Sequence, residues 1–161
     1  MLALLMGMKK KLKWIFGVLV AGFGLLQFTN PARTNPPVVN DLPVTNAPPR
    51  VAVLLRAACY DCHSYESKWP WYSHIAPVSW LIAQDVNEGR EHLNFSDWPQ
   101  DNARAAKKFD RINEVLDYRE MPPKKYTALH PDARLTEAQH QELLDWSATE
   151  AERWRALAKP E

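Results

Sequence analysis

Cys59-Tyr60-Asp61-Cys62-His63 is a C-x-x-C-H segment, and it contains both cysteines of this 161-residue chain. Two thiols at this spacing lie on one short turn. There each thiol can add to a vinyl group of a single haem, and the next residue then lies beneath the iron. The segment therefore predicts haem c (iron) attached covalently through Cys59 and Cys62, with His63 as the proximal axial ligand.

Two other uses of the cysteines fit the chain less well. A redox-active C-x-x-C dithiol is typical of a βαβ setting, and no alternating strand pattern flanks this segment. A structural zinc site needs a second ligand pair at finger-like spacing. The remaining histidines form no such pair; they are His74, His92, His130 and His140.

Met121 is the candidate for the second axial ligand of the iron. The other three methionines, at positions 1, 6 and 8, all lie in the N-terminal segment. Pro122 and Pro123 follow Met121, so they end a helix and hold the preceding backbone extended. A thioether sulfur favours ferrous iron and raises the reduction potential. The alternatives are a bis-histidine haem that uses one of the four other histidines, and an open sixth position.

Residues 1–28 have the pattern of a signal peptide or an uncleaved membrane anchor. Four lysines between Lys9 and Lys13 precede an apolar stretch of fifteen residues, Trp14 to Phe28. As a helix this stretch spans about 22 Å, which is short for a membrane and favours a signal peptide. The lack of an A-x-A cleavage site after Phe28 favours an anchor. Either reading predicts a domain on the periplasmic side of a bacterial cytoplasmic membrane, soluble in the periplasm if the leader is cleaved.

Residues 29–47 are predicted to be a proline-rich linker. Six of the thirteen prolines fall within 29–50, which indicates either a stiff extended tether or an irregular arm that wraps the domain. Beyond the four leader lysines, the chain has 20 − 4 = 16 basic residues against 19 acidic ones, a net charge of −3. This balance gives no indication of the basic surface that nucleic-acid binding requires.

Residues 48–158 are predicted to form one all-α haem-binding domain. Apolar residues recur at three- and four-residue steps in four stretches. These are Val51 to Cys62, Val78 to Gly89 after Pro77, Ala105 to Leu116, and a stretch that opens at Thr136. Pro48 and Pro49 suit the first turn of the first helix, with Asn46 as its cap. Thr136-x-x-Gln139 resembles a capping box.

Several segments occur together in one order along the chain, and in this they resemble the bacterial haem-binding domain family. The segments are Pro31 to Pro36, Cys59 to Ser64, Lys68 to Ser73, Ile75 to Trp80, Gly89-Arg90, Leu93 to Ser96, and Met121-Pro122-Pro123. The resemblance covers about residues 31 to 145. It implies a small exported protein with one c-type haem and a cytochrome c-like helical fold. It does not imply a defined reaction.

Similarity to cytochromes c also suggests neighbours for the haem. In those proteins a proline carbonyl often accepts a hydrogen bond from the proximal histidine, and Pro70 or Pro77 is the candidate here. Aromatic side chains can line the haem edge and reach its propionates. The candidates for this role are Trp69, Trp71, Tyr72, Trp80 and Tyr126. The alternative is that the prolines only shape a loop and the aromatics only form the core.

An iron saturated by His63 and Met121 favours electron transfer over catalysis. Substrate cannot reach such an iron without loss of a ligand, and no separate catalytic constellation stands out in the chain. We therefore expect an electron carrier with an unknown redox partner protein, for which a membrane-bound protein is one candidate. The alternatives are a peroxidase-like haem enzyme or a gas or redox sensor with a labile or open sixth position, and a module that presents haem to a membrane partner.

Overall fold

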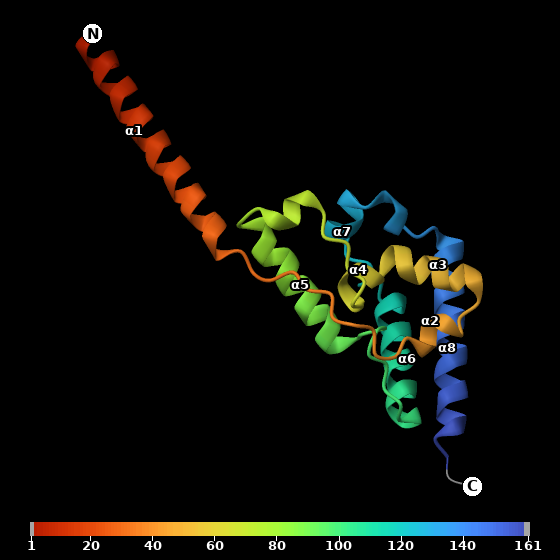
Figure 1. The fold of residues 1–161 in the computed structure, drawn as a ribbon. Coiled ribbons are helices and arrows are strands. Elements are labelled where there is room, and N and C mark those ends of the chain that lie inside the picture. The colour runs from red at the N-terminus through yellow and green to blue at the C-terminus, as the bar shows by residue number, and fades with distance from the viewer. Residues whose placement is uncertain (1, 160–161) are drawn as a thin grey trace. The chain divides into compact units, whose positions relative to one another are not determined.

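The computed structural model describes residues 2–159 (Figure 1). By its internal contacts the chain divides into two units. The first unit joins residues 1–33 to 69–85, and the second joins residues 34–68 to residues 86 onward. The elements are α1 (Leu2–Leu26), η1 (Gln27–Thr29), α2 (Leu42–Thr45), α3 (Pro49–Ala58), α4 (Tyr60–His63), η2 (Trp71–His74), α5 (Val78–His92), α6 (Asn102–Asp117), α7 (Lys124–Leu129), η3 (Pro131–Ala133) and α8 (Glu137–Leu157). Between residues 2 and 159 every regular element is a helix, which confirms the all-α prediction.

The first unit contains the N-terminal apolar helix expected from the sequence. Met8–Thr29, 22 residues long, is sufficiently long and apolar to cross a membrane, and a signal sequence would meet the same criterion. The chain just after this helix pairs with residues 73–80 of the same unit. The Gln27 side chain hydrogen-bonds both backbone groups of Ala76, and the Trp80 indole N–H donates to the Thr29 carbonyl at 3.2 Å.

The proline-rich segment behaves as an arm within the second unit. The backbone N–H of Val39 donates to the Ser96 carbonyl at 2.8 Å. The Trp98 backbone N–H donates to the Asn40 carbonyl at 3.0 Å, and the Asn40 side-chain amide donates to the Trp98 carbonyl at 3.1 Å. These bonds hold residues 34–40 against the loop after α5, so the arm alternative, and not the free tether, describes this part of the chain.

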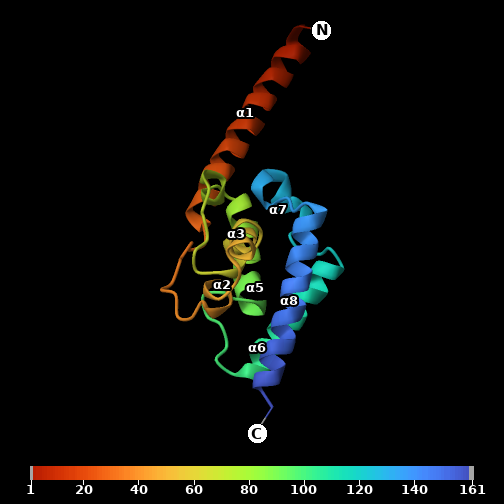
Figure 2. The same ribbon diagram turned by 90° about the vertical axis from the view of Figure 1, so that its right-hand side faces the viewer.

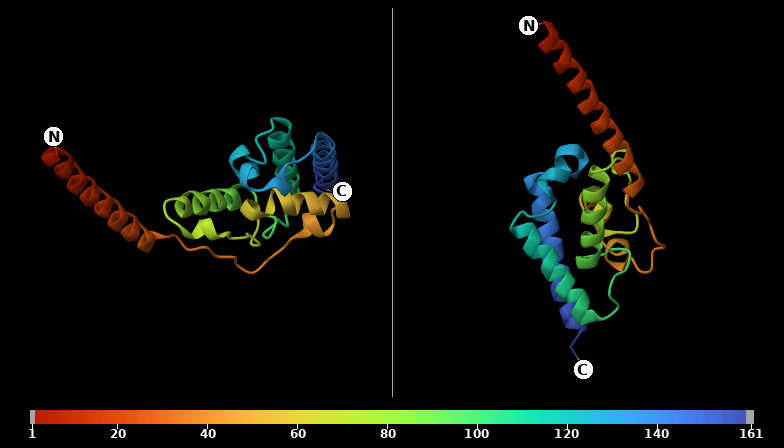
Figure 3. Two further views of the ribbon diagram at one scale, coloured as in Figure 1. Left: turned by 90° about the horizontal axis from the view of Figure 1, so that it is seen from above. Right: turned by 90° about the vertical axis from the view of Figure 1, so that its left-hand side faces the viewer.

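The core of the second unit is built around α6 and α8, which lie side by side (Figures 2 and 3). The predicted apolar stripe of α6 is fully buried, with Phe109 at its centre. Phe109 contacts Trp146 of α8 edge to face, with ring centroids 5.3 Å apart. Thr136 and Gln139 form the predicted capping box at the start of α8.

Three local features differ from the sequence prediction. The first predicted helix does not run unbroken into the C-x-x-C-H segment: it ends at Ala58, and α4 begins at Tyr60. The break lies at Cys59, whose backbone has φ −124° and ψ −37° and leaves helical geometry. Asn46 is not the cap of α3, because that helix begins directly after Pro48. The short helix α7 has no counterpart in the prediction.

Candidate functional site

Helix α4 carries the C-x-x-C-H segment and is fixed to the core by Tyr60. The Tyr60 ring is buried and stacks on Phe95, with centroids 5.3 Å apart and planes 12° apart. The Ser64 hydroxyl donates to the Tyr60 carbonyl at 2.8 Å and closes the end of the helix. The backbone N–H of Phe95 donates to the His63 carbonyl at 2.8 Å. The motif is therefore held both by its backbone and by an aromatic anchor.

The ring of His63 is oriented by two backbone carbonyls at the end of α5. Its Nδ1 lies 2.8 Å from the Gly89 oxygen and 3.0 Å from the Leu93 oxygen. Carbonyl oxygens only accept hydrogen bonds, so Nδ1 carries the ring hydrogen and Nε2 keeps its lone pair. Burial lowers the pKa of His63 and favours the neutral ring that metals bind.

The sequence suggested a carbonyl of Pro70 or Pro77 as the partner of this histidine, or else that both prolines only shape a loop. Gly89 and Leu93 take the role assigned to Pro70 or Pro77, because the last turn of α5 and the residue after it pass behind the ring. The physical effect is the one anticipated, since a hydrogen bond to Nδ1–H fixes the ring and raises the basicity of Nε2.

Gly89 allows α5 to approach α4 closely enough for this bond. A Cβ on Gly89 would lie 2.6 Å from the Cys62 carbonyl oxygen and 3.2 Å from the Cys62 Cβ. Heavy atoms cannot come this near without displacing backbone. A residue with no side chain is therefore required behind the haem motif.

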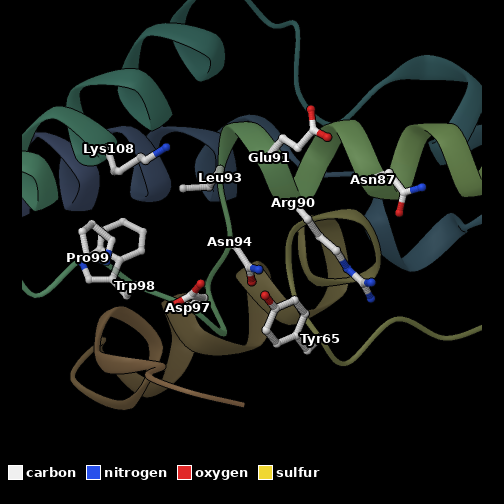
Figure 4. A pocket seen from close by; sticks show the side chains of 10 residues that line it. All are labelled: Tyr65, Asn87, Arg90, Glu91, Leu93, Asn94, Asp97, Trp98, Pro99 and Lys108. Carbon is white, nitrogen blue, oxygen red and sulfur yellow. The ribbon is translucent and has the colours of Figure 1, made fainter. Parts of the chain in front are cut away.

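Arg90, the next residue of α5, ties the chain after the motif to the proline-rich arm. Its guanidinium donates to the Ser64 carbonyl at 2.8 Å, the Thr34 carbonyl at 2.9 Å, and the side chains of Asn35 and Ser67 at 3.0 Å. Figure 4 shows Arg90 with Tyr65 beside a surface groove of about 490 Å³. The guanidinium carbon lies 5.3 Å from the centre of the Tyr65 ring. Arg90 thus supports the segment that follows His63.

The two cysteines are free thiols and both are partly buried. Burial, and in addition the nearby Cys62, raises the pKa of the Cys59 thiol to about 12. A redox-active dithiol needs the opposite shift, because the thiolate is its reactive form. Between residues 2 and 159, no three His, Cys, Asp or Glu side chains gather as a metal-ion site.

The Met121 loop is attached at both of its ends. At its start, the backbone N–H groups of Glu120 and Met121 point to the Val115 carbonyl of α6. At its end, Pro123 precedes α7, and the Tyr126 hydroxyl donates to Asp61 Oδ2 at 2.8 Å. Met121 itself is half-buried. A side chain of the C-x-x-C-H segment therefore bonds the helix that directly follows the Met-Pro-Pro loop.

The rival histidines have other environments. His140 is buried, and its Nε2 hydrogen-bonds the Leu116 carbonyl at 2.9 Å. His130 stacks on the Tyr126 ring, with centroids 4.0 Å apart, and its Nδ1 lies 2.9 Å from the Tyr126 carbonyl. His74 and His92 are exposed. Two of the four alternative histidines, His130 and His140, therefore already have structural contacts within the protein.

The other predicted haem neighbours, Pro70, Pro77, Trp69, Trp71, Tyr72 and Trp80, lie in the first unit. The Trp69 indole nitrogen is buried there without a hydrogen-bond partner. Trp71 is 75% exposed, and the Trp80 indole is bonded to Thr29. Contact of these residues with haem stays a prediction. Tyr126 has a defined partner, Asp61, which the sequence did not indicate.

The haem-binding domain family model matches residues 21–149. The chain belongs to this family. Haem is therefore its cofactor, and the site agrees, since His63 offers Nε2 beside two thiols in the haem-attachment spacing. The chain is also 27% identical over 99 residues to cytochrome c peroxidase Ccp of Escherichia coli (strain K12). That match covers 59% of the chain but 21% of the relative. No solved structure matches the chain.

Three features of this haem-binding domain were missed from the sequence. They are the paired carbonyls behind His63, the close approach at Gly89, and the bond between Tyr126 and Asp61. Gly89-Arg90 and Leu93 to Ser96 were recognised as family segments, but their physical role was not. All of these segments hold α4 in place.

Proposed function

We propose that this haem-binding domain carries one c-type haem with His63 and Met121 as axial ligands and transfers electrons. Cys59 and Cys62 would hold the haem as thioethers. When bound, the haem iron supplies one-electron redox chemistry. The chain's own residues would orient His63, favour its neutral ring and hold the Met121 loop for the second ligand.

The observation that carries this proposal is the geometry of His63. Two carbonyl oxygens, at 2.8 and 3.0 Å, define the hydrogen on Nδ1 and leave Nε2 as the ligating atom. A proximal histidine held in this way is a stronger donor to iron. The anchored Met121 loop supports a second protein ligand, which would leave no iron position for substrate.

The proposed location is the outer face of the cytoplasmic membrane, with the Met8–Thr29 segment as the anchor. The four leader lysines would stay on the cytoplasmic side. The proposed partner is a one-electron redox protein, for which a protein in the same membrane is one candidate. Cleavage of the leader would instead release a soluble periplasmic domain.

A second candidate function is that of a peroxidase-like enzyme. The similarity to a protein named cytochrome c peroxidase favours it, although this chain spans about a fifth of that relative. An enzyme of this kind needs a sixth position that is open or becomes open. Met121 would then be displaced or would not bind.

Carbon monoxide and peroxide separate the two functions. The reduced wild-type protein is mixed with carbon monoxide and its absorption spectrum is followed. The oxidised protein is separately supplied with peroxide and a one-electron donor. A carrier shows no rapid spectral change and no peroxide consumption. Fast carbon monoxide binding together with peroxide turnover would contradict the carrier and establish the enzyme.

A further inference from the structure

Asp61 uses both of its carboxylate oxygens to connect the haem motif with other parts of the second unit. Oδ1 accepts the backbone N–H of Lys68 at 3.0 Å, and Oδ2 accepts the Tyr126 hydroxyl at 2.8 Å. The first bond is local, seven residues along the chain. The second joins residues 65 positions apart. Asp61 is therefore the point at which the C-x-x-C-H segment holds α7.

Several contacts hold the Tyr126 side chain and α7 in place for the bond to Asp61. One face of its ring stacks on His130, with centroids 4.0 Å apart, and its backbone N–H donates to the Pro123 carbonyl at 2.9 Å. The Arg134 side chain donates to the Thr127 carbonyl at 2.8 Å and fastens the other end of α7. Burial and the bond to Asp61 raise the pKa of Tyr126, so its hydroxyl keeps the hydrogen it donates.

In the chain, Met121 lies between the end of α6 and Tyr126, whose hydroxyl bonds Asp61. Only Pro122 and Pro123 separate it from α7, and proline fixes its own φ angle and restricts the residue before it. On the other side, Glu120 and Met121 are bonded to the Val115 carbonyl. Movement of α7 away from Asp61 would therefore carry the methionine with it.

We propose that the Tyr126–Asp61 hydrogen bond is a latch that holds Met121 at the iron, with Tyr126 as a positioning residue. This inference rests on the proposed function, because it requires Met121 to be a ligand. Through Asp61, the C-x-x-C-H segment would thus help to keep Met121 bound to the iron. We therefore expect that removal of the Tyr126 hydroxyl weakens the bond between the iron and Met121, which lies five residues earlier in the chain.

The test is the binding of imidazole to the oxidised holoprotein, followed by absorption. Imidazole competes with Met121 for the iron, so its apparent affinity measures how firmly Met121 is held. Tyr126→Phe keeps the ring and its stacking on His130 and removes only the donor. We expect the imidazole affinity to rise about tenfold or more, as for a lost hydrogen bond to a charged group.

Tyr118→Phe is the matched control. Tyr118 directly follows α6, is 69% exposed and lies three residues before Met121. This variant therefore removes a phenolic oxygen close to Met121 without touching the bond to Asp61. It should bind imidazole like the wild type. Asp61→Asn should raise the affinity, and the double variant Asp61→Asn/Tyr126→Phe should not exceed the larger single effect, because both changes break one bond.

The outcomes separate the latch from the proposed function. If Met121→Ala leaves the imidazole affinity unchanged, Met121 is not the ligand, and both proposals are overturned. If Met121→Ala raises the affinity but Tyr126→Phe does not, only the latch is overturned. A lower melting temperature for Tyr126→Phe with unchanged imidazole affinity also overturns the latch, since it shows a purely structural role.

Discussion

The carbonyl oxygen of Cys62 lies 2.6 Å from the point that a Cβ on Gly89 would occupy. The same glycine presents its own carbonyl to the Nδ1 of His63 at 2.8 Å. One residue thus sets the spacing between α4 and α5 and orients His63, the proposed proximal ligand. A change at Gly89 should therefore affect both the contact between α4 and α5 and the hydrogen bond to His63.

Gly89→Ala should destabilise the holoprotein and alter its haem. The added methyl group must push α5 from α4, at a cost of about 1–3 kcal/mol, typical of overpacking. The bond to Nδ1 would lengthen, His63 would become a weaker donor, and the reduction potential would rise. Denaturant unfolding and a redox titration measure the two effects.

Gly24→Ala is the control for that variant. Gly24 lies in α1, and a Cβ there meets no atom within 4 Å. This change should leave both the unfolding midpoint of the haem domain and its potential unaltered. Equal behaviour of the two alanine variants would contradict the close-approach role of Gly89.

Arg90→Lys should destabilise the domain although it preserves the charge. A lysine cannot reproduce a guanidinium fork that reaches Ser64, Thr34, Asn35 and Ser67 together. We expect a loss of about 1–3 kcal/mol, because acceptors on the buried residues Ser64 and Ser67 would be left unpaired. Arg111→Lys is the comparison, since Arg111 is exposed and pairs with its helix neighbour Glu114. It should leave the free energy of unfolding close to the wild-type value, because exposed ion pairs contribute little. A neutral Arg90→Lys would refute the role given to Arg90.

Replacement of both cysteines should abolish covalent haem attachment. Cys59→Ala/Cys62→Ala removes both thiols that would add to the vinyl groups. Wild-type protein should retain haem on a denaturing gel stained for haem peroxidase activity, and the double variant should not. Cys59→Ala alone should keep one thioether and therefore some stain. Stain in the double variant would rule out c-type attachment through these residues.

The helices and the motif could be predicted from the sequence because both depend on local patterns. Apolar spacing identified α5, α6 and α8, and the Thr136–Gln139 box located the start of α8. The carbonyl partners of His63 could not be predicted in this way. Any backbone residue offers a carbonyl, so only the packing of α5 on α4 shows which ones face the ring.

The hydrogen bond between Tyr126 and Asp61 could not be predicted from the sequence for a similar reason. Helix α7 is six residues long, too short for an apolar period to emerge. Its place depends on contacts from residues distant in sequence, such as the carboxylate of Asp61. Aromatic content alone suggested that Tyr126 contacts haem, and it did not reveal this partner.

The absorption spectrum of the oxidised protein in the far red reports directly on the bond between Met121 and the iron. A methionine–iron bond gives a charge-transfer band in this region. We predict the band in the wild type and in the histidine controls His74→Ala and His92→Ala, and its loss in Met121→Ala. A wild-type spectrum without the band, or a Met121→Ala spectrum that retains it, would contradict ligation by His63 and Met121.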